Sequence, residues 1–350
     1  MRGRGTGGHY AKSRRKRKVS IVSAGIDVSA KKIDVVIRVD GKNSKAKQFS
    51  QSAAGYQALS KHLSKAKPAW VVLEATGVYY VDLAIALCQA GLPVCVINPL
   101  STHHFAKAKL NHAKTDATDA ALLAEYGQVM QPRHWVVPSQ ELLHLRGLGR
   151  HINRLVHSRA RAKNRLHALS STQTTLKALI RDEEQGIRQL DKRIEKLRTA
   201  AHELLNSMPT LKASFDTLCT AVGVGENSAL SILAEISILP SHLKAKQVSR
   251  QAGLDVQVSQ SGSSVHKPGR MSKAGNAYLR TALFYPAMSA ARHDPNARVF
   301  YDKLVERGKK KKQALVAIMR KYLTGLWACY LSGENFDSSK LFNTELLKMA

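Results

Sequence analysis

Short apolar runs separated by turn residues occupy the first third of the chain. Runs such as 21–26 and 33–39 are typical of strands, with a turn between them. Apolar residues at helical spacing, as at Tyr56, Leu59 and Leu63, predict intervening helices. The order β-β-β-α-β-α-β-α predicts a mixed α/β sheet. The predicted strands cover 21–26, 33–39, 45–50, 70–73 and 93–97, and the predicted helices cover 53–65, 81–90 and 121–126.

A different pattern begins after a connector at 132–138. From 139 to about 208, apolar residues recur every three or four positions, which predicts long helices. A polar stretch at 181–186 predicts the turn of a helical hairpin. Its apolar seam could also bring subunits together.

The remaining chain predicts a mainly helical C-terminal region. Helices are expected over about 227–236 and up to about Tyr330. The Ser- and Gly-rich stretch 252–269 has the composition of a flexible linker, but a basic segment follows it at once. We therefore expect a basic arm (1–18), an α/β domain (19–131), a helical hairpin spacer (132–210), a C-terminal domain (211–332) and a tail without an assigned role (333–350).

The net charge of the chain indicates what kind of partner it binds. The 350 residues include 55 Lys and Arg against 25 Asp and Glu, a net charge of +30, which favours a polyanion and above all nucleic acid. No apolar run has transmembrane length and no signal peptide is visible, so we expect no membrane and a cytoplasmic, nucleoid-associated bacterial protein. Four scattered cysteines lack zinc spacing and are expected to be reduced. The basic arm either contacts phosphates or is a solvated tail.

Four acids form the candidate catalytic group. Asp116 and Asp119 lie three residues apart at the start of a predicted helix and share a face. Paired carboxylates suit a hard divalent cation, although this stretch taken alone favours a helix cap and a dipole interaction. Asp27 and Glu74 each end a predicted strand; alone, Asp27 is an ordinary turn residue. A ribonuclease-H-like sheet would bring all four to one Mg²⁺ (or Mn²⁺) site.

Basic residues and glycines form the candidate nucleic-acid surface. The series Arg146, Arg150 and Arg154 lies on one face of a long helix, and a solvated coiled-coil face is the alternative. Gly223 and Gly225 precede a helix as in a helix-hairpin-helix turn, in which backbone amides approach phosphate. The full predicted set is Arg14, Arg15, Arg17, Lys107, Lys109, Lys114, Arg146, Arg150, Arg154, Arg161, Arg165, Gly223, Gly225, Lys267, Arg270, Lys273 and Arg280.

Several motifs together resemble a known family. The chain is similar, from about Ala24 to Leu331, to the DEDD transposases of the insertion-sequence "one-ten" group and the related Piv DNA invertases. The motifs are Gly-Ile-Asp-Val-Ser at 25–29, Leu-Glu-Ala-Thr-Gly at 73–77, Lys-Thr-Asp-Ala-Thr-Asp-Ala at 114–120, Ala-Gly-Leu at 252–254, Ser-Gly at 261–262, and Lys-Ala-Gly-Asn at 273–276 with Leu279-Arg280.

The resemblance implies a RuvC-like domain, a helical hairpin spacer and a C-terminal transposase domain. It implies a divalent metal held by Asp27, Glu74, Asp116 and Asp119, and Ser261 as the nucleophile that forms a phosphoserine bond to DNA. In the family this serine works beside the acids of another subunit of a dimer or tetramer. A structured non-coding RNA pairs with donor and target DNA.

We therefore predict a site-specific DNA recombinase of a mobile element. Two alternatives remain at this stage. In a metal-dependent nuclease of the Holliday-junction type the acids would activate water and Ser261 would be linker. A non-catalytic nucleic-acid-binding protein would use the charge alone.

Overall fold

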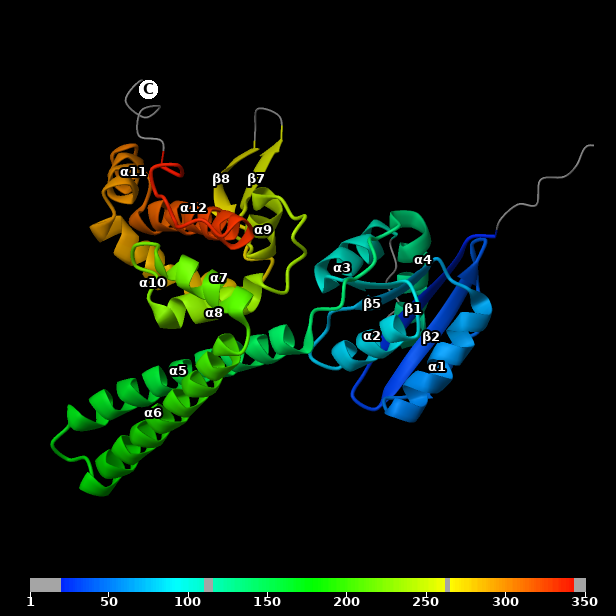
Figure 1. Cartoon of the computed structure of the whole chain (residues 1–350), viewed down its shortest axis with the longest axis horizontal. Helices are drawn as coiled ribbons and strands as arrows, with labels where there is room; N and C mark the ends of the chain where they lie inside the picture. Colours follow the sequence, from blue (N-terminus) through cyan, green and yellow to red (C-terminus); the bar gives the residue numbers. More distant parts are fainter. Residues whose placement is uncertain (1–19, 110–115, 262–264, 343–350) are drawn as a thin grey trace, which may run out of the picture. The chain divides into compact units, whose positions relative to one another are not determined.

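The computed structural model describes residues 20–109, 116–261 and 265–342. The chain divides into two compact units, Met1–Val137 and Pro138–Ala350. Figure 1 shows a sheet with helices in the first unit and an almost wholly helical second unit. The expected fold class, a mixed α/β domain followed by a mainly helical region, is confirmed. Arg14, Arg15, Arg17 and Lys114 lie outside the described residues.

The first unit is built on one mixed sheet. Its strands follow the order β3-β2-β1-β5-β6, with β4 also paired to β2. Strand β1 runs antiparallel to β2 and parallel to β5, and β5 runs parallel to β6. The elements are β1 (Val22–Val28), β2 (Lys32–Val39), β3 (Lys42–Asn43), β4 (Lys47–Ser50), α1 (Ala53–Ala66), β5 (Trp70–Glu74), α2 (Tyr80–Gln89), β6 (Val94–Ile97), α3 (Pro99–Ala108) and α4 (Asp116–Met130).

Alternation along the strands separates the two faces of this sheet. Ile26, Val35 and Leu73 belong to a buried cluster with residues of α1 and α2. The residues between them face the other way and pack on α4, as Val36 does against Ala120 and Ala124. Successive side chains of a strand point to opposite faces, so both faces are buried by helices.

The second unit begins with two long helices joined by a short loop, α5 (Gln140–Ser170) and α6 (Lys177–Asn206). They form a hairpin that projects from the other helices of this unit (Figure 1). The turn predicted at 181–186 is wrong, because those residues lie inside α6. Gly186 meets no neighbour there, so its position is compatible with a helix surface. The observed loop is instead rich in Ser and Thr, which favour turns over helix interiors.

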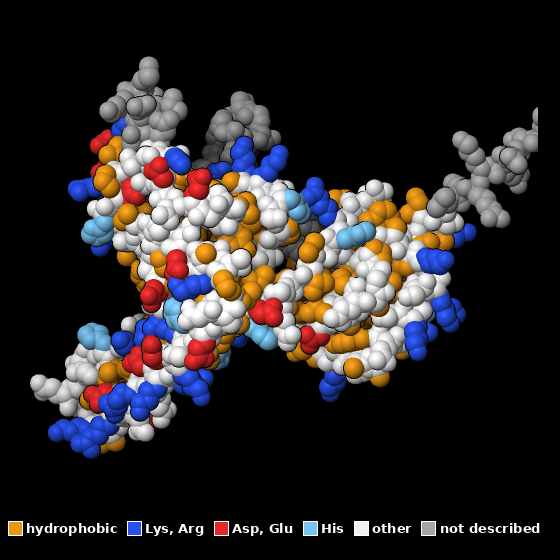
Figure 2. Space-filling model, in the orientation of Figure 1, with side chains coloured by type: hydrophobic (Ala, Val, Ile, Leu, Met, Phe, Trp, Pro, Cys, Tyr) orange, Lys and Arg blue, Asp and Glu red, His pale blue; other side chains and the backbone are white. Residues whose placement is uncertain are grey.

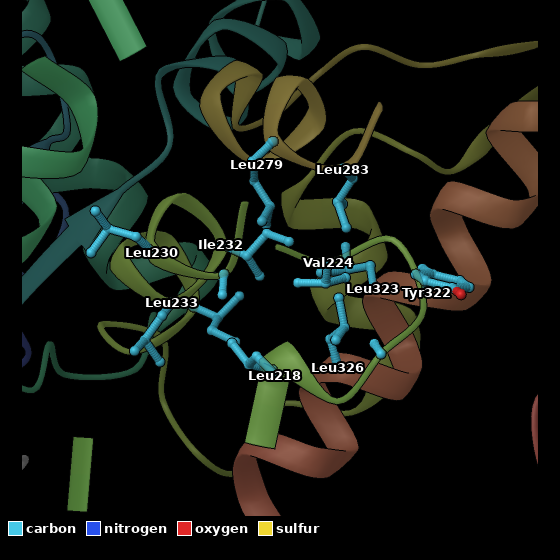
Figure 3. Packing of buried hydrophobic residues seen from close by; sticks show 14 of the residues in the cluster. Leu218, Val224, Leu230, Ile232, Leu233, Leu279, Leu283, Tyr322, Leu323 and Leu326 are labelled. Atoms are coloured by element: carbon cyan, nitrogen blue, oxygen red, sulfur yellow. The ribbon is translucent and has the colours of Figure 1, made fainter. Parts of the chain in front are cut away.

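Shorter helices complete this unit around one core. Figure 3 shows Leu218, Val224, Ile232, Leu283 and Leu326 converging from separate elements. The remaining elements are α7 (Pro209–Cys219), α8 (Glu226–Ile236), α9 (Ala245–Gln251), β7 (Val256–Ser261), β8 (Val265–Met271), α10 (Ala277–His293), α11 (Pro295–Glu306) and α12 (Lys311–Ser332).

Two segments differ from the composition-based expectation. The Ser- and Gly-rich stretch contains paired strands, because β7 and β8 form an antiparallel two-stranded sheet rather than a linker. The expected tail is packed for the part that is described. Phe342 is 1% exposed within the core, and the Phe336 ring lies 5.0 Å from that of Tyr322. An amphipathic C-terminal segment thus covers the end of the core.

Within the described ranges, the structure has no helix long and apolar enough to cross a membrane. Cys88, Cys95, Cys219 and Cys329 are all free, as expected.

Candidate active site

Carboxylates gather at one end of the sheet, on the face covered by α4. Ile26 of β1 pairs with Leu73 of the parallel strand β5, so Asp27 and Glu74 come next along neighbouring strands. Asp34 lies directly opposite Asp27 on the antiparallel strand β2. Directly opposed residues of paired strands share a face. The sheet therefore presents three acids from three adjacent strands on one side.

Helix α4 brings the other two acids to this face. Asp116 and Asp119 lie in its first turn. The helix lies very close to β1 because Gly25 has no side chain: a Cβ there would come within 2.0 Å of the Ala120 carbonyl oxygen. The Ser23 hydroxyl also donates a hydrogen bond of 2.6 Å to the Ala124 carbonyl oxygen. Small residues in β1 and α4 thus fix where the acidic turn meets the sheet.

The electrostatics of Asp27 show that these acids share one environment. The pKa of Asp27 is raised from 3.8 to about 6. Burial is the largest cause, and the charges of Asp119, Asp116, Asp34 and Glu74 follow in that order. Both effects disfavour a further negative charge. A cation placed among the five carboxylates would relieve both.

Neighbouring side chains hold several of these carboxylates. The Lys32 ammonium lies 2.6 Å from Asp116 Oδ2 and 3.5 Å from Asp34 Oδ2, and it lowers the pKa of Asp116. Glu74 accepts hydrogen bonds of 2.8 Å from the hydroxyls of Thr76 and Thr102, one on each carboxylate oxygen. The site therefore contains a lysine ammonium between two of the acids and two oriented hydroxyls on a third.

The carboxylate oxygens of this site are suitable ligands for a divalent ion, although the side chains do not converge on one point. Carboxylate oxygens are the ligands that Mg²⁺ and Mn²⁺ prefer. Among the described residues, no three His, Cys, Asp or Glu side chains are close enough to hold a metal as they stand. The metal role of Asp27, Glu74, Asp116 and Asp119 thus stays a prediction. The positions of Asp116 and Asp119 in the first turn of α4 also fit the helix-dipole alternative.

Sequence reasoning missed Asp34 and Lys32. Both lie within or at the edge of an apolar run, where a single charged residue carries no signal by itself. The register of the β1–β2 hairpin could have identified Asp34, because the tight turn after Val28 places Asp34 opposite Asp27.

The predicted nucleophile lies in the β7–β8 hairpin of the second unit. Ser261 is the last residue of β7, and its backbone pairs with Val265. Its side chain, that of Lys267 and residues 262–264 lie outside the described part of the structure. Ser261 thus stays a prediction.

Several arginines predicted to bind nucleic acid have structural partners. Glu235 is 2% exposed, and its carboxylate receives two hydrogen bonds from Arg150, at 2.5 and 3.0 Å. Arg146 lies 3.5 Å from the same carboxylate, and Asn276 donates to it at 2.5 Å. This cluster joins α5, α8 and the start of α10. It gives Arg146 and Arg150 a packing role that pattern reasoning did not foresee.

Other members of the predicted set are also engaged. Arg165 forms a two-fold hydrogen-bonded ion pair with Glu183, at 2.6 and 3.1 Å, and Lys109 pairs with Glu125. The Arg280 guanidinium donates to the Ala252 and Gly275 carbonyl oxygens at 2.7 and 3.0 Å. Burial lowers the pKa of Arg280. Each of these side chains ties two segments together.

Another part of the set is exposed. Arg154, Arg161, Lys107, Arg270 and Lys273 all have exposed side chains. Figure 2 shows Lys and Arg side chains gathered over the α5–α6 hairpin. These residues are the ones available to a polyanion.

The two glycines of the predicted helix-hairpin-helix turn differ in environment. Gly223 has φ +85°, and a Cβ there would lie 2.6 Å from Ser289 Cβ, so this residue allows close packing on α10. Gly225 precedes α8 as its N-cap, and a Cβ there would meet nothing.

Comparisons with known proteins define the class. A model of DEDD transposases of the IS110 group, described as "Transposase", matches residues 24–172. A second, described as "Transposase IS116/IS110/IS902 family", matches residues 216–302. The first match contains the four predicted acids and the second contains Ser261. The protein is thus an enzyme of the transposase and DNA recombinase class.

Whole-chain relatives agree. The chain is 32% identical over 270 residues to the pilin gene-inverting proteins of Moraxella bovis and Moraxella lacunata, covering 76% of this chain and 81% of each relative. It is 28% identical over 153 residues to the insertion element IS110 uncharacterized 43.6 kDa protein of Streptomyces coelicolor, covering 44% of this chain and 38% of that protein. The chain belongs to the IS110 family of transposases.

Proposed function

We propose that this transposase cuts and rejoins DNA through a covalent bond to Ser261, with Asp27, Glu74, Asp116 and Asp119 holding Mg²⁺ or Mn²⁺. The observation that supports it best is the gathering of carboxylates around Asp27, whose pKa is raised to about 6. A site of this kind is poised to accept positive charge. When bound, the ion would stabilise negative charge on a scissile phosphate.

In the proposed reaction, Ser261 Oγ attacks the phosphorus of a DNA phosphodiester. A bond from phosphorus to Oγ forms while the bond from phosphorus to the leaving sugar oxygen breaks. The serine proton passes to solvent, and the leaving oxygen takes up a proton. Attack by the hydroxyl of another strand reverses these steps, restores a phosphodiester and frees Ser261. No outside energy source is needed because each step exchanges one phosphate ester for another.

The proposed partners are donor and target DNA, a structured non-coding RNA and further copies of the chain. Base pairing by the RNA would select sequence while the protein holds backbone and shape. Exposed basic side chains such as Arg154, Arg161 and Arg270 would contact phosphates. A dimer or tetramer would bring the serine of one subunit to the acids of another. We expect this assembly to act at the bacterial nucleoid.

Trapping a protein–DNA adduct tests the proposal. The full chain is incubated with labelled DNA carrying the ends of its own element, any co-purifying RNA and Mg²⁺, and is then run on a denaturing gel. We expect label to migrate with the protein, and expect Ser261→Ala and Asp27→Asn to abolish this signal. Ser259→Ala, a neighbouring serine on the same strand, is the matched control and should keep it.

The acidic site also supports a second candidate, a nuclease in which the carboxylates activate water. That candidate predicts cleavage without an adduct. If Ser261→Ala still cleaves while Asp27→Asn does not, the nuclease replaces the recombinase. An adduct that is lost in Ser259→Ala and kept in Ser261→Ala would show that Ser259, and not Ser261, is the nucleophile.

A further inference from the structure

A cavity between α5 and α10 lies within the second unit, away from the β7–β8 hairpin along the chain. Its volume is about 670 Å³. It is open to solvent and presents basic and polar side chains. Those that matter below are Arg154, His157, Arg161 and Asn164 of α5 with Tyr278 and Thr281 of α10.

The charge of this cavity is unbalanced. None of the residues that line it is acidic. Arg154 and Arg161 are both exposed, and within the described ranges neither has a carboxylate at ion-pair distance. Arg161 donates only to the neutral Ser158 hydroxyl, at 3.3 Å. Other arginines of α5 are neutralised by partners, as Arg159 is by Asp191 at 2.7 Å. The cavity thus holds two cationic groups ready for an anion.

Tyr278 lines the cavity, and Tyr285 lies two turns further along α10, outside the cavity lining. Tyr278 is half-buried, and the Arg150 guanidinium carbon lies 4.6 Å from its ring centre. Tyr285 is 67% exposed, an unusual exposure for a large aromatic side chain. Tyr278, Thr281 and Tyr285 are spaced three and four residues apart, so they share one face of the helix. Because Arg150 covers the Tyr278 ring, the ring on this face that is open for stacking is that of Tyr285.

We propose that this groove, lined by Arg154, Arg161 and Tyr278, binds an unpaired strand of DNA that also reaches Tyr285 on the same face of α10. Guanidinium groups hold phosphates, and exposed rings stack on unpaired bases; the combination is typical of single-strand binding. A duplex keeps its base faces stacked inside and would leave the rings against sugar and phosphate. DNA is favoured over RNA because the matching family is one of transposases and the relatives include pilin gene-inverting proteins.

This inference rests on the proposed function to the extent that strand cleavage and exchange release unpaired DNA. The groove would then hold a strand that has left its partner. It involves neither the acids nor Ser261.

Binding of the full chain to labelled oligonucleotides in EDTA tests it. The probes are an oligothymidylate of about 20 nucleotides, an oligouridylate of the same length and a duplex of mixed sequence, followed by fluorescence anisotropy. The variant Arg154→Gln/Arg161→Gln is compared with Lys163→Gln/Lys192→Gln, which removes two exposed charges from the same hairpin outside the cavity.

We expect the arginine variant to weaken oligothymidylate binding about 10-fold or more, and to lower the log–log salt slope by about 1.4 because two phosphate contacts are lost. The lysine control should change affinity by only about 2-fold. Tyr285→Ala should weaken binding about 5-fold or more, with an unchanged salt slope, since it removes stacking and no charge. Because Tyr285 is mostly exposed, this variant should keep the wild-type circular dichroism spectrum.

Three results would overturn the proposal. The arginine variant could bind as the lysine control does, the duplex could lose as much affinity as the single strand, or oligouridylate could bind more tightly than oligothymidylate in a groove-dependent manner, which would make RNA the occupant. The binding assay contains EDTA and requires no strand cleavage. A negative result in this binding assay therefore says nothing about adduct formation. A negative result in the adduct experiment likewise does not affect the interpretation of the binding assay.

Discussion

At the scale of single residues, Asp27 makes stability depend on pH. Its pKa in the folded protein, about 6, is above its ordinary value of 3.8. As pH rises between these values the unfolded chain loses this proton first, so the free energy of unfolding falls, and it levels off above pH 6. Since the side chain is only partly buried, we expect a loss of about 1–2 kcal/mol rather than the full value of the shift.

Asp27→Asn should remove this fall. In EDTA the variant should be more stable than the parent at pH 8 and lose its advantage near pH 4. Urea unfolding at a series of pH values measures it. Asp82→Asn, an exposed carboxylate in α2, is the control and should keep the parental profile. A parental profile in Asp27→Asn would show that Asp27 does not carry the effect.

Residue-level prediction used local sequence pattern. Asp27 and Glu74 are predicted because each ends an apolar strand, and Asp116 and Asp119 because of helical spacing; the metal role of all four stays a prediction. Partners distant in sequence were not predictable. Nothing near Arg150 in the sequence shows that Glu235, 85 positions away, will accept its hydrogen bonds. The same pattern of basic residues thus fits a nucleic-acid surface and a buried ion pair.

At the scale of elements, Glu235 holds three helices together. Glu235→Gln removes the charge from a carboxylate that is 2% exposed, and with it the ion pairs to Arg146 and Arg150. Breaking a buried pair leaves an uncompensated charge, so we expect a loss of about 2–4 kcal/mol in unfolding free energy. Urea unfolding followed by far-UV circular dichroism measures it, because most helices belong to this unit.

The matched control is Glu183→Gln. Glu183 pairs with Arg165 between α5 and α6, where the Arg165 side chain is 59% exposed. Exposed pairs contribute little, so this change should cost less than about 1 kcal/mol. Equal losses in the two variants would refute a special role for Glu235.

Gly186 tests the corrected position of the helical turn. In the structure it lies within α6, and a Cβ there would meet nothing. Alanine is favoured over glycine in a helix interior, so Gly186→Ala should raise the free energy of unfolding by about 0.5–1 kcal/mol. Thermal unfolding checks the sign. A lower melting temperature would favour the turn predicted from the sequence.

Hydrophobic periodicity predicted the helices correctly at the element level. Predictions that used residue composition in place of periodicity were wrong. Helices α5 and α6 were expected because Leu and Ile recur at three and four residues. The polar residues at 181–186 predict a turn, yet Arg, Glu and Gln are also good surface helix formers. Strands β7 and β8 were missed because their Ser-rich sequence lacks apolar alternation. Their pairing is visible only in the backbone hydrogen bonds.

At the scale of the whole molecule, the proposed acids and nucleophile lie in different units of the chain. Asp27 belongs to Met1–Val137 and Ser261 to Pro138–Ala350. A chain built this way can complete its site either within one copy or between two. The two arrangements give opposite results when inactive variants are mixed.

Mixing Asp27→Asn with Ser261→Ala distinguishes them. If the serine of one subunit serves the acids of another, a mixed dimer contains one site with both groups intact. Random exchange of subunits makes about half of the dimers mixed, so about a quarter of parental adduct formation should return. If each copy completes its own site, every site in the mixture lacks one group and no activity returns. Co-refolding the two variants, with each refolded alone as the control, makes the measurement independent of slow subunit exchange.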